Sequence, residues 1–110
     1  MEEENKEILP VFSIKKHILV YGKHEYILKN AQNLINNSDM TSTGFTSLGE
    51  MLDYIRMNPL DAVLIGGGVD PHDRLKIQEL VKADVPHVKV IEHFGGPATI
   101  LNEIRSALGE

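Results

Sequence analysis

The residues best able to do chemistry lie in three short segments, each of which directly follows an apolar run. The segments span residues 22–25, 66–72 and 92–97 and hold three histidines, several acidic residues and two runs of glycine. If the apolar runs are parallel strands, their carboxyl ends share one edge of a sheet, with strands about 4.8 Å apart. We therefore expect the three segments to converge at a ligand-binding edge.

Each segment contributes one histidine, and the three are His24, His72 and His93. Three imidazoles can form an open zinc-type site, with Asp70 or Glu92 as a further ligand. The chain shows no fixed ligand spacing such as His-x3-His, and histidines at loop mouths and helix starts often face the solvent. A histidine metal site is therefore an alternative hypothesis, and no cofactor is predicted.

Two glycine runs, Gly66–Gly68 and Gly95–Gly96, each lead toward the expected start of a helix. Unshielded backbone N–H groups and the positive end of a helix dipole attract anions, and Lys23 would add a positive charge. Neither run fits a Walker or dinucleotide-binding pattern, and glycines equally serve tight turns and close packing. A further alternative is thus a small anionic ligand, a phosphate or a nucleotide. Its predicted contacts are Lys23, Gly67, Gly68, Gly95 and Gly96.

No residue of the chain has the context of a catalytic nucleophile. The serines lack the strand-turn-helix setting of a nucleophile elbow, and cysteine is absent. Glu92 and His93 are adjacent at a strand end, where neighbouring side chains point to opposite faces. The pattern favours a protein that is not an enzyme, and no catalytic residue is predicted.

A strand-then-helix rhythm, repeated four times from His17 onward, must position these segments. Strands are expected over residues 17–21, 40–45, 61–65 and 87–91, and helices over about 25–37, 47–58, 70–83 and from 97 onward. Such alternation indicates βαβ units and a parallel sheet, whose right-handed crossovers restrict the topology. The two most apolar strands, the first and the third, belong in the centre. The predicted fold is an α/β three-layer sandwich with a parallel four-stranded sheet of order 2-1-3-4. The first and last helices would cover one face and the two middle helices the other.

Length and composition limit the class of protein. A chain of 110 residues with 42% hydrophobic and 25% charged residues makes one globular domain. The formal charge of -5 argues against a nucleic-acid partner, because phosphate neutralisation needs clustered Lys and Arg. No apolar run reaches the ~18 residues of a membrane span, and the acidic start is unlike a signal peptide. We expect a cytoplasmic protein with no membrane association.

The N-terminal region predicts a partner. Residues 1–7 read as an acidic, disordered tail, and residues 8–110 as a single domain. The apolar segment Ile8–Ile14 has no obvious place in a four-stranded sheet, and Pro10 restricts it to an edge strand or a strap. Lys89, between two valines of the last strand, is typical of an exposed sheet edge. We expect a protein partner or a homodimer through this segment and the sheet edge, or else a monomer strapped across its own helices.

Residues 40–65 resemble the second strand, second helix and third strand of response-regulator receiver domains. The stretch has a short strand, a small residue at Ser47, an amphipathic helix, and then Asn58-Pro59-Leu60-Asp61 leading into a buried strand. Lys15–Tyr21 is similar to the opening strand of that family. The resemblance covers residues 15–68 in order and the last helix more loosely. It implies a flavodoxin-like fold.

The resemblance also implies that the reactive positions of receivers are missing here. Receivers are phosphorylated on an Asp at the end of the third strand, where this chain has Gly66. They bind magnesium through an acidic pair after the first strand, where this chain has Tyr21-Gly22-Lys23. Their Thr or Ser after strand four and Lys after strand five have no counterpart in Ile91-Glu92-His93-Phe94. The 42 residues after Gly68 are too few for two further strand–helix units, so one unit is missing. The implied protein is a degenerate receiver, a non-catalytic interaction or regulatory module that is not phosphorylated by the receiver mechanism.

Overall fold

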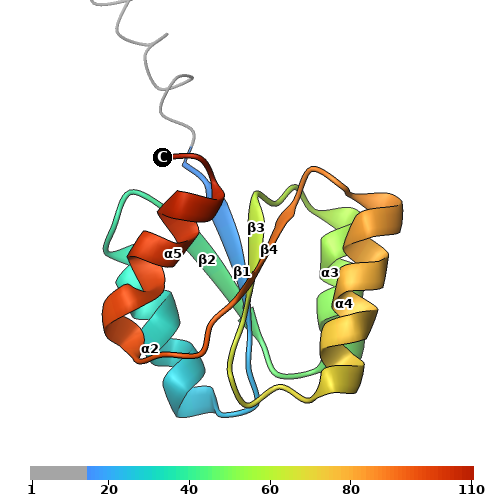
Figure 1. The fold of residues 1–110 in the computed structure, drawn as a ribbon, viewed down its shortest axis with the longest axis horizontal. Coiled ribbons are helices and arrows are strands. Elements are labelled where there is room, and N and C mark those ends of the chain that lie inside the picture. The colour runs from blue at the N-terminus through green and yellow to red at the C-terminus, as the bar shows by residue number, and fades with distance from the viewer. Residues whose placement is uncertain (1–14) are drawn as a thin grey trace, which may run out of the picture.

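The computed structural model describes residues 15–110, in which strands and helices alternate (Figure 1). The predictions for the acidic tail at 1–7 and for the apolar segment Ile8–Ile14 lie outside the described residues. The strands are β1 (His17–Tyr21), β2 (Thr41–Phe45), β3 (Ala62–Ile65) and β4 (Lys89–Glu92). The helices are α2 (Glu25–Asn36), α3 (Leu48–Met57), α4 (Pro71–Asp84) and α5 (Ile100–Ala107), the last preceded by the short 3-10 helix η2 (Pro97–Thr99).

The four strands form one parallel sheet in the order β2-β1-β3-β4, which confirms the predicted topology. Leu19 of β1 lies opposite Thr43 on one side and Val63 on the other. The two central strands are almost entirely buried, whereas both edge strands are partly exposed. Apolar strands gain most from cover on both faces, and the two most apolar strands therefore take the centre.

Helices α2 and α5 cover one face of the sheet, and α3 and α4 cover the other, as predicted (Figure 1). Alternate residues of β1 therefore enter different cores. Ile18 and Val20 pack with α2 and α5, whereas Leu19 and Tyr21 pack with α3 and α4. The residues of β3 divide in the same way. The carboxyl ends of both central strands thus border two separate layers.

Capping side chains explain where two of the helices begin. Asp70 accepts a hydrogen bond from the Asp73 backbone N–H at 2.9 Å, and Pro71 takes the first position of α4. Ser47 caps α3 by accepting from the Glu50 N–H at 3.4 Å. The two N-caps, Ser47 and Asp70, stand at the first residues of the helices expected over 47–58 and 70–83. Among residues 15–110, none of the helices has both the length and the apolar character needed to cross a bilayer.

Two boundaries near the C-terminus differ from the prediction. β4 begins at Lys89 rather than His87, because the Val88 N–H bonds to the Val85 carbonyl in a turn. Only from Lys89 does the backbone reach β3, at the Asp61 carbonyl. α5 begins at Ile100 because the chain first turns through η2. The connection between β4 and α5 is therefore longer than expected.

Candidate functional site

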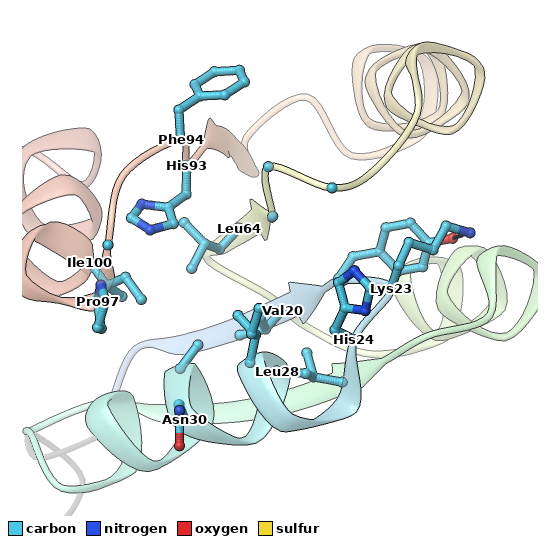
Figure 2. A pocket seen from close by; sticks show the side chains of 18 of the residues that line it. Val20, Lys23, His24, Leu28, Asn30, Leu64, His93, Phe94, Pro97 and Ile100 are labelled. Carbon is cyan, nitrogen blue, oxygen red and sulfur yellow. Dashed lines mark hydrogen bonds between the residues drawn. The ribbon is translucent and has the colours of Figure 1, made fainter.

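A cavity of about 360 Å³ opens at the carboxyl edge of the sheet, between α2 and α5 (Figure 2). It is bordered by the ends of β1 and β3 and by the segments that follow β1, β3 and β4. The structure thus brings together parts of all three segments that carry potential chemistry. All the residues predicted to contact a ligand line the cavity, namely Lys23, Gly67, Gly68, Gly95 and Gly96.

The inner lining of the cavity is apolar. Val20 of β1 and Leu64 of β3 contribute from the sheet, Leu28 and Ala31 from α2, and Ile100 from the start of α5. Each of these residues is more than nine-tenths buried. The side chains come from elements that the hydrophobic pattern of the sequence already placed in one core, so the cavity is an unfilled part of that core.

The rim of the cavity combines exposed apolar side chains with glycines. Ile27 and Phe94 are 62% and 72% exposed. A Cβ atom placed at Gly22 or Gly96 would meet no atom within 4 Å, so the lack of side chains there helps to keep the cavity open. A concave, mostly apolar site of this volume is typical of places that bind small molecules.

His93 supplies a buried polar group to this lining, with 9% of the residue exposed. Its Nδ1 lies 2.6 Å from Oε1 of Glu103 on α5, and the other carboxylate oxygen accepts a hydrogen bond from the Thr99 hydroxyl at 3.2 Å. An ionised carboxylate can only accept hydrogen bonds, so Nδ1 of His93 must donate. In the neutral ring, the second nitrogen Nε2 then carries a lone pair.

His24 lines the same cavity from the other side. Figure 2 shows His24 near the end of β1 and His93 across the cavity, beyond Leu64. His24 precedes the first residue of α2 and makes no side-chain capping bond there. Its ring lies close to the glycine run, because a Cβ on Gly68 would be 3.8 Å from His24 Cδ2. Two of the three predicted histidines therefore share the cavity, on opposite walls.

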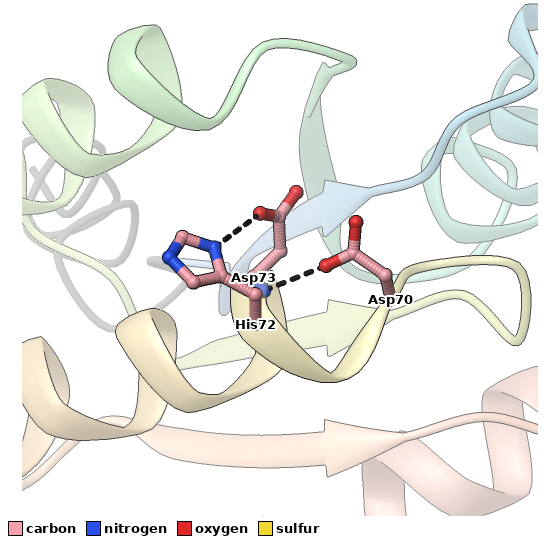
Figure 3. A group of neighbouring side chains, drawn as sticks. All are labelled: Asp70, His72 and Asp73. Atoms are coloured by element: carbon pink, nitrogen blue, oxygen red, sulfur yellow. Dashed lines mark hydrogen bonds and ion pairs between the residues drawn. The ribbon is translucent and has the colours of Figure 1, made fainter.

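His72 lies apart from them, in the first turn of α4. Its Nδ1 is 3.3 Å from Oδ1 of Asp73, and potential ligand atoms of Asp70, His72 and Asp73 lie within 4.8 Å of one another (Figure 3). Both carboxylates already have partners, since Asp70 caps α4 and Asp73 pairs with Lys23 at 3.2 Å. Within residues 15–110 the three histidines do not gather into one metal-ligand group. The reason is that α4 belongs to the opposite layer of the sheet.

Lys23 reaches the rim of the cavity, but its ammonium group points away from it (Figure 2). Nζ lies 3.2 Å from Oδ2 of Asp73 and 3.3 Å from the hydroxyl of Tyr21. Tyr21 is fully buried, and its hydroxyl donates to the same carboxylate oxygen at 2.8 Å. We call these residues the Tyr21–Lys23–Asp73 cluster. The sequence analysis expected the charge of Lys23 to attract an anionic ligand, but this charge is already paired with Asp73.

The cluster reinforces the ordinary ionisation states of its members at neutral pH. The hydrogen bond from Tyr21 is the main cause that lowers the pKa of Asp73, and Lys23 adds to this shift against the effect of burial. Burial, followed by the bond to Asp73, raises the pKa of Tyr21. The hydrogen bonds to Tyr21 and then to Asp73 raise the pKa of Lys23. A neutral phenol, an ammonium and a carboxylate are therefore the stable combination.

Arg74 holds the glycine run after β3, a role that sequence reasoning missed. Its Nε donates to the Val69 carbonyl at 2.9 Å, and its Nη2 donates to the carbonyls of Gly66 at 3.0 Å and Gly67 at 3.2 Å. Its Nη1 pairs with Oε1 of Glu92 at 2.6 Å. No local pattern marks a single arginine on a helix for this role, because its partners come from a loop and a strand. The guanidinium charge, like that of the lysine, is engaged outside the cavity.

The adjacent residues Glu92 and His93 diverge, as expected for neighbours at a strand end. Glu92 bonds to Arg74 and Gln78 of α4, whereas His93 bonds to Glu103 of α5. They therefore do not form an acid–base pair. The described residues that line the cavity include no serine, threonine or carboxylate.

The solved structures that are similar to this fold include a natural receiver protein and a designed protein. A response regulator receiver protein from Burkholderia phymatum matches with a TM-score of 0.63 at 17% sequence identity, over 86% of this chain and 77% of that one. A de novo designed Rossmann fold protein matches with a TM-score of 0.61 at 14% identity, over 88% of this chain and 100% of that one. No protein-family model and no curated protein matches the sequence. At these identities the likeness shows the fold alone, and that fold is the flavodoxin-like α/β architecture.

Proposed function

We propose that this chain is a non-catalytic, receiver-like module that binds a small ligand in the cavity between α2 and α5. The supporting observation is the position of the cavity. It lies at the carboxyl edge of the parallel sheet, at the ends of β1 and β3. Between these two strands the order along the sheet changes direction, because β2 lies on one side of β1 and β3 on the other. Open α/β sheets bind their ligands at such a switch point. We propose the cytoplasm as its location, on the composition of the chain alone.

The proposal includes the absence of phosphorylation by the receiver mechanism. By its spacing in the chain, the phosphoacceptor position corresponds to Gly66, and the end of β1 carries Tyr21 in place of an acid. Asp73, the carboxylate beside Tyr21, already accepts a hydrogen bond from it and pairs with Lys23. Incubation with acetyl phosphate and Mg²⁺ should therefore leave the intact mass of the full chain unchanged. A gain of one phosphoryl group that hydroxylamine removes would contradict the proposal.

The charges around the cavity favour an uncharged ligand over a phosphate or a nucleotide. Lys23 faces Asp73 at 3.2 Å, and Arg74 faces Glu92 at 2.6 Å. An anion would have to take Lys23 from its carboxylate partner. The formal charge of -5 on the chain also disfavours the approach of an anion. The backbone N–H groups of the glycine runs remain as polar contacts for an uncharged molecule.

Ligand binding can be tested by NMR titration of the ¹⁵N-labelled chain. Small aromatic and aliphatic fragments should shift the amide signals of residues 66–68 and 93–96, together with that of Ala31 on α2. Inorganic phosphate and nucleotides at equal concentration serve as the comparison and should shift these signals less. Fragments that leave all of these signals in place would refute the proposed function.

A pair of glycine variants separates loss of binding from loss of folding. Gly96→Leu adds a side chain at the rim of the cavity, and Gly49→Leu adds the same side chain on α3. At both positions a Cβ meets no atom within 4 Å, and the extended backbone at Gly96 suits any residue. Both variants should stay within about 0.5 kcal/mol of the wild-type stability. We expect fragment binding to be lost in Gly96→Leu and kept in Gly49→Leu.

A second candidate role is binding of a protein partner, or of a second copy of the chain, through the N-terminal segment and the sheet edge. The exposure of β4 favours it. Lys89 is exposed, and its N–H bonds to the carbonyl of Asp61, just before β3. The His93 N–H likewise bonds to the Ile65 carbonyl at the end of β3. By alternation, the N–H of Val90 points to the open edge, where another strand can accept its hydrogen.

Sedimentation velocity of the full chain at increasing concentration tests this second role. Val90→Pro removes the outward N–H, and proline is tolerated on edge strands. We expect a concentration-dependent dimer in the wild type, a shift to monomer in Val90→Pro, and a dimer in the control Val90→Thr, which keeps the N–H. A wild-type chain that stays monomeric throughout would exclude the homodimer.

A further inference from the structure

His93 and Glu103 together determine how the buried polar group of the cavity can bind a ligand. The side chain of His93 is 11% exposed, and its Nδ1 lies 2.6 Å from the Glu103 carboxylate. Because the carboxylate accepts, the ring proton stays on Nδ1. In the neutral ring the other nitrogen, Nε2, carries the lone pair and is a hydrogen-bond acceptor.

Within residues 15–110, no hydrogen bond to Nε2 of His93 accompanies the one at Nδ1. Figure 2 shows the ring on the cavity wall, between Leu64 and the segment Pro97–Ile100. A buried acceptor without a donor is unfavourable, and buried polar groups in folded proteins are nearly always paired. Because the cavity opens to solvent, water can donate to this acceptor in the free protein, and a ligand that brings an N–H or O–H group into the cavity would take the place of that water.

We infer that the cavity selects uncharged, largely apolar molecules that carry one hydrogen-bond donor, which binds Nε2 of His93. This inference rests on the proposed binding of a small ligand in the cavity. The apolar part of the ligand would lie against Val20 and Leu64, which line the cavity and are buried. A charged ligand fits less well, because Lys23 is paired with Asp73 and Glu103 is engaged by His93.

Glu103 acts as a positioning residue in this arrangement. Its second oxygen accepts from the Thr99 hydroxyl at 3.2 Å, which fixes the orientation of the carboxylate. In Glu103→Gln, the amide oxygen would keep the bond from Thr99, and the amide NH₂ would face Nδ1 of His93. The ring proton would then move to Nε2, because Nδ1 must accept from the amide. The selectivity of the cavity would change from ligands that donate to ligands that accept.

The test compares three bicyclic probes of similar size by NMR titration. Indole carries an N–H donor, 1-methylindole has lost it, and quinoline carries only an acceptor. We expect the wild type to bind indole about tenfold more tightly than 1-methylindole or quinoline, the effect of one buried hydrogen bond. In Glu103→Gln quinoline should become the preferred probe, and in His93→Phe the preference for indole over 1-methylindole should disappear.

The ring proton itself can be observed independently of any ligand. Long-range ¹H–¹⁵N correlation spectra should show Nδ1 of His93 protonated in the wild type and Nε2 protonated in Glu103→Gln. A merely structural role of Glu103 would change stability without moving this proton or inverting the probe preference. If His93→Phe does not fold, the comparison of indole with 1-methylindole in the wild type still decides the inference.

The two possible failures are distinguishable. Equal binding of indole and 1-methylindole, with shifts confined to the cavity, would overturn the role of His93 and leave the binding module in place. No shift of the cavity signals by any of the three probes would overturn both the inference and the proposed function.

Discussion

The carboxyl ends of β1 and β3 border two regions that are filled in different ways. On the side of α3 and α4, Tyr21, Lys23 and Asp73 form a closed polar cluster with contacts of 2.8 to 3.3 Å. On the side of α2 and α5, Val20 and Leu64 border a cavity of about 360 Å³. The difference arises from two neighbouring residues of β1, Val20 and Tyr21, which face opposite layers because side chains alternate along a strand. Tyrosine is much longer than valine and therefore fills more of its layer.

Together with the proposed function, this contrast assigns stability to one layer and ligand binding to the other. A buried tyrosine needs a partner for its hydroxyl, and Asp73 supplies it. The Asp73 carboxylate and the Lys23 ammonium therefore stabilise the folded state. The shorter valine leaves space unfilled, which gains no packing energy but leaves room for a ligand. We expect substitutions in the cluster to change stability, and substitutions in the cavity to change binding.

Removal of the Tyr21 side chain should have the largest effect. Tyr21→Ala empties a fully buried position and should lower the free energy of unfolding by about 3–5 kcal/mol. Tyr21→Phe removes only the hydroxyl and should cost about 1.5–3 kcal/mol, because the lost hydrogen bond goes to a charged group. Urea denaturation of both variants measures the two values. A Tyr21→Phe variant as stable as the wild type would show that the cluster contributes packing alone.

The charge of Asp73 should have a smaller, pH-dependent effect. At neutral pH, Asp73→Asn should lower the free energy of unfolding by about 1–2 kcal/mol. The pKa of Asp73 in the folded state lies below the usual value of 3.8. The Asp73 charge therefore stabilises the fold fully above pH 3.8, and this stabilisation is lost as the pH falls through the pKa of the folded state. The stability difference between wild type and variant should therefore shrink below about pH 4.

This difference is measured by urea denaturation at a series of pH values. The other titrating groups contribute equally to the wild type and the variant, so they cancel in this difference. One of them is His17, whose pKa is lowered chiefly by burial. Acidification below the usual histidine pKa of 6.5 therefore destabilises the fold through His17. A difference between wild type and Asp73→Asn that grows on acidification would contradict the assignment of the charge to Asp73.

Two isoleucine variants should show the smallest effect and compare the layers directly. Val20→Ile adds one methylene on the cavity side and should change the free energy of unfolding by less than about 1 kcal/mol, in the stabilising direction. Val63→Ile adds the same group in the closed layer, where the valine is fully buried, and should destabilise by about 1–3 kcal/mol. Fragment binding should weaken only in Val20→Ile. Equal losses of stability in both variants would show that the cavity is not open.

Most of the fold could be predicted from the hydrophobic pattern, because the buried face of each element shows in residues close together in the chain. The helix expected over 25–37 is α2, Glu25–Asn36, and the buried strand expected over 61–65 is β3, Ala62–Ile65. The strand order followed from right-handed crossovers and from two strongly apolar strands in the centre. The candidate site could be predicted as a place, the edge where the segments after the strands converge.

The sequence by itself determined which segments meet, since alternation of strands and helices leaves few ways to build a parallel sheet. Only the tertiary structure decided which side chains face one another. Tyr21 and Asp73 are 52 residues apart in the chain, yet their bond turns Lys23 away from the cavity. His93 likewise faces Glu103 rather than the other histidines. Such pairs depend on the layer that each side chain enters and on polar partners that meet only after folding, and no local pattern encodes either.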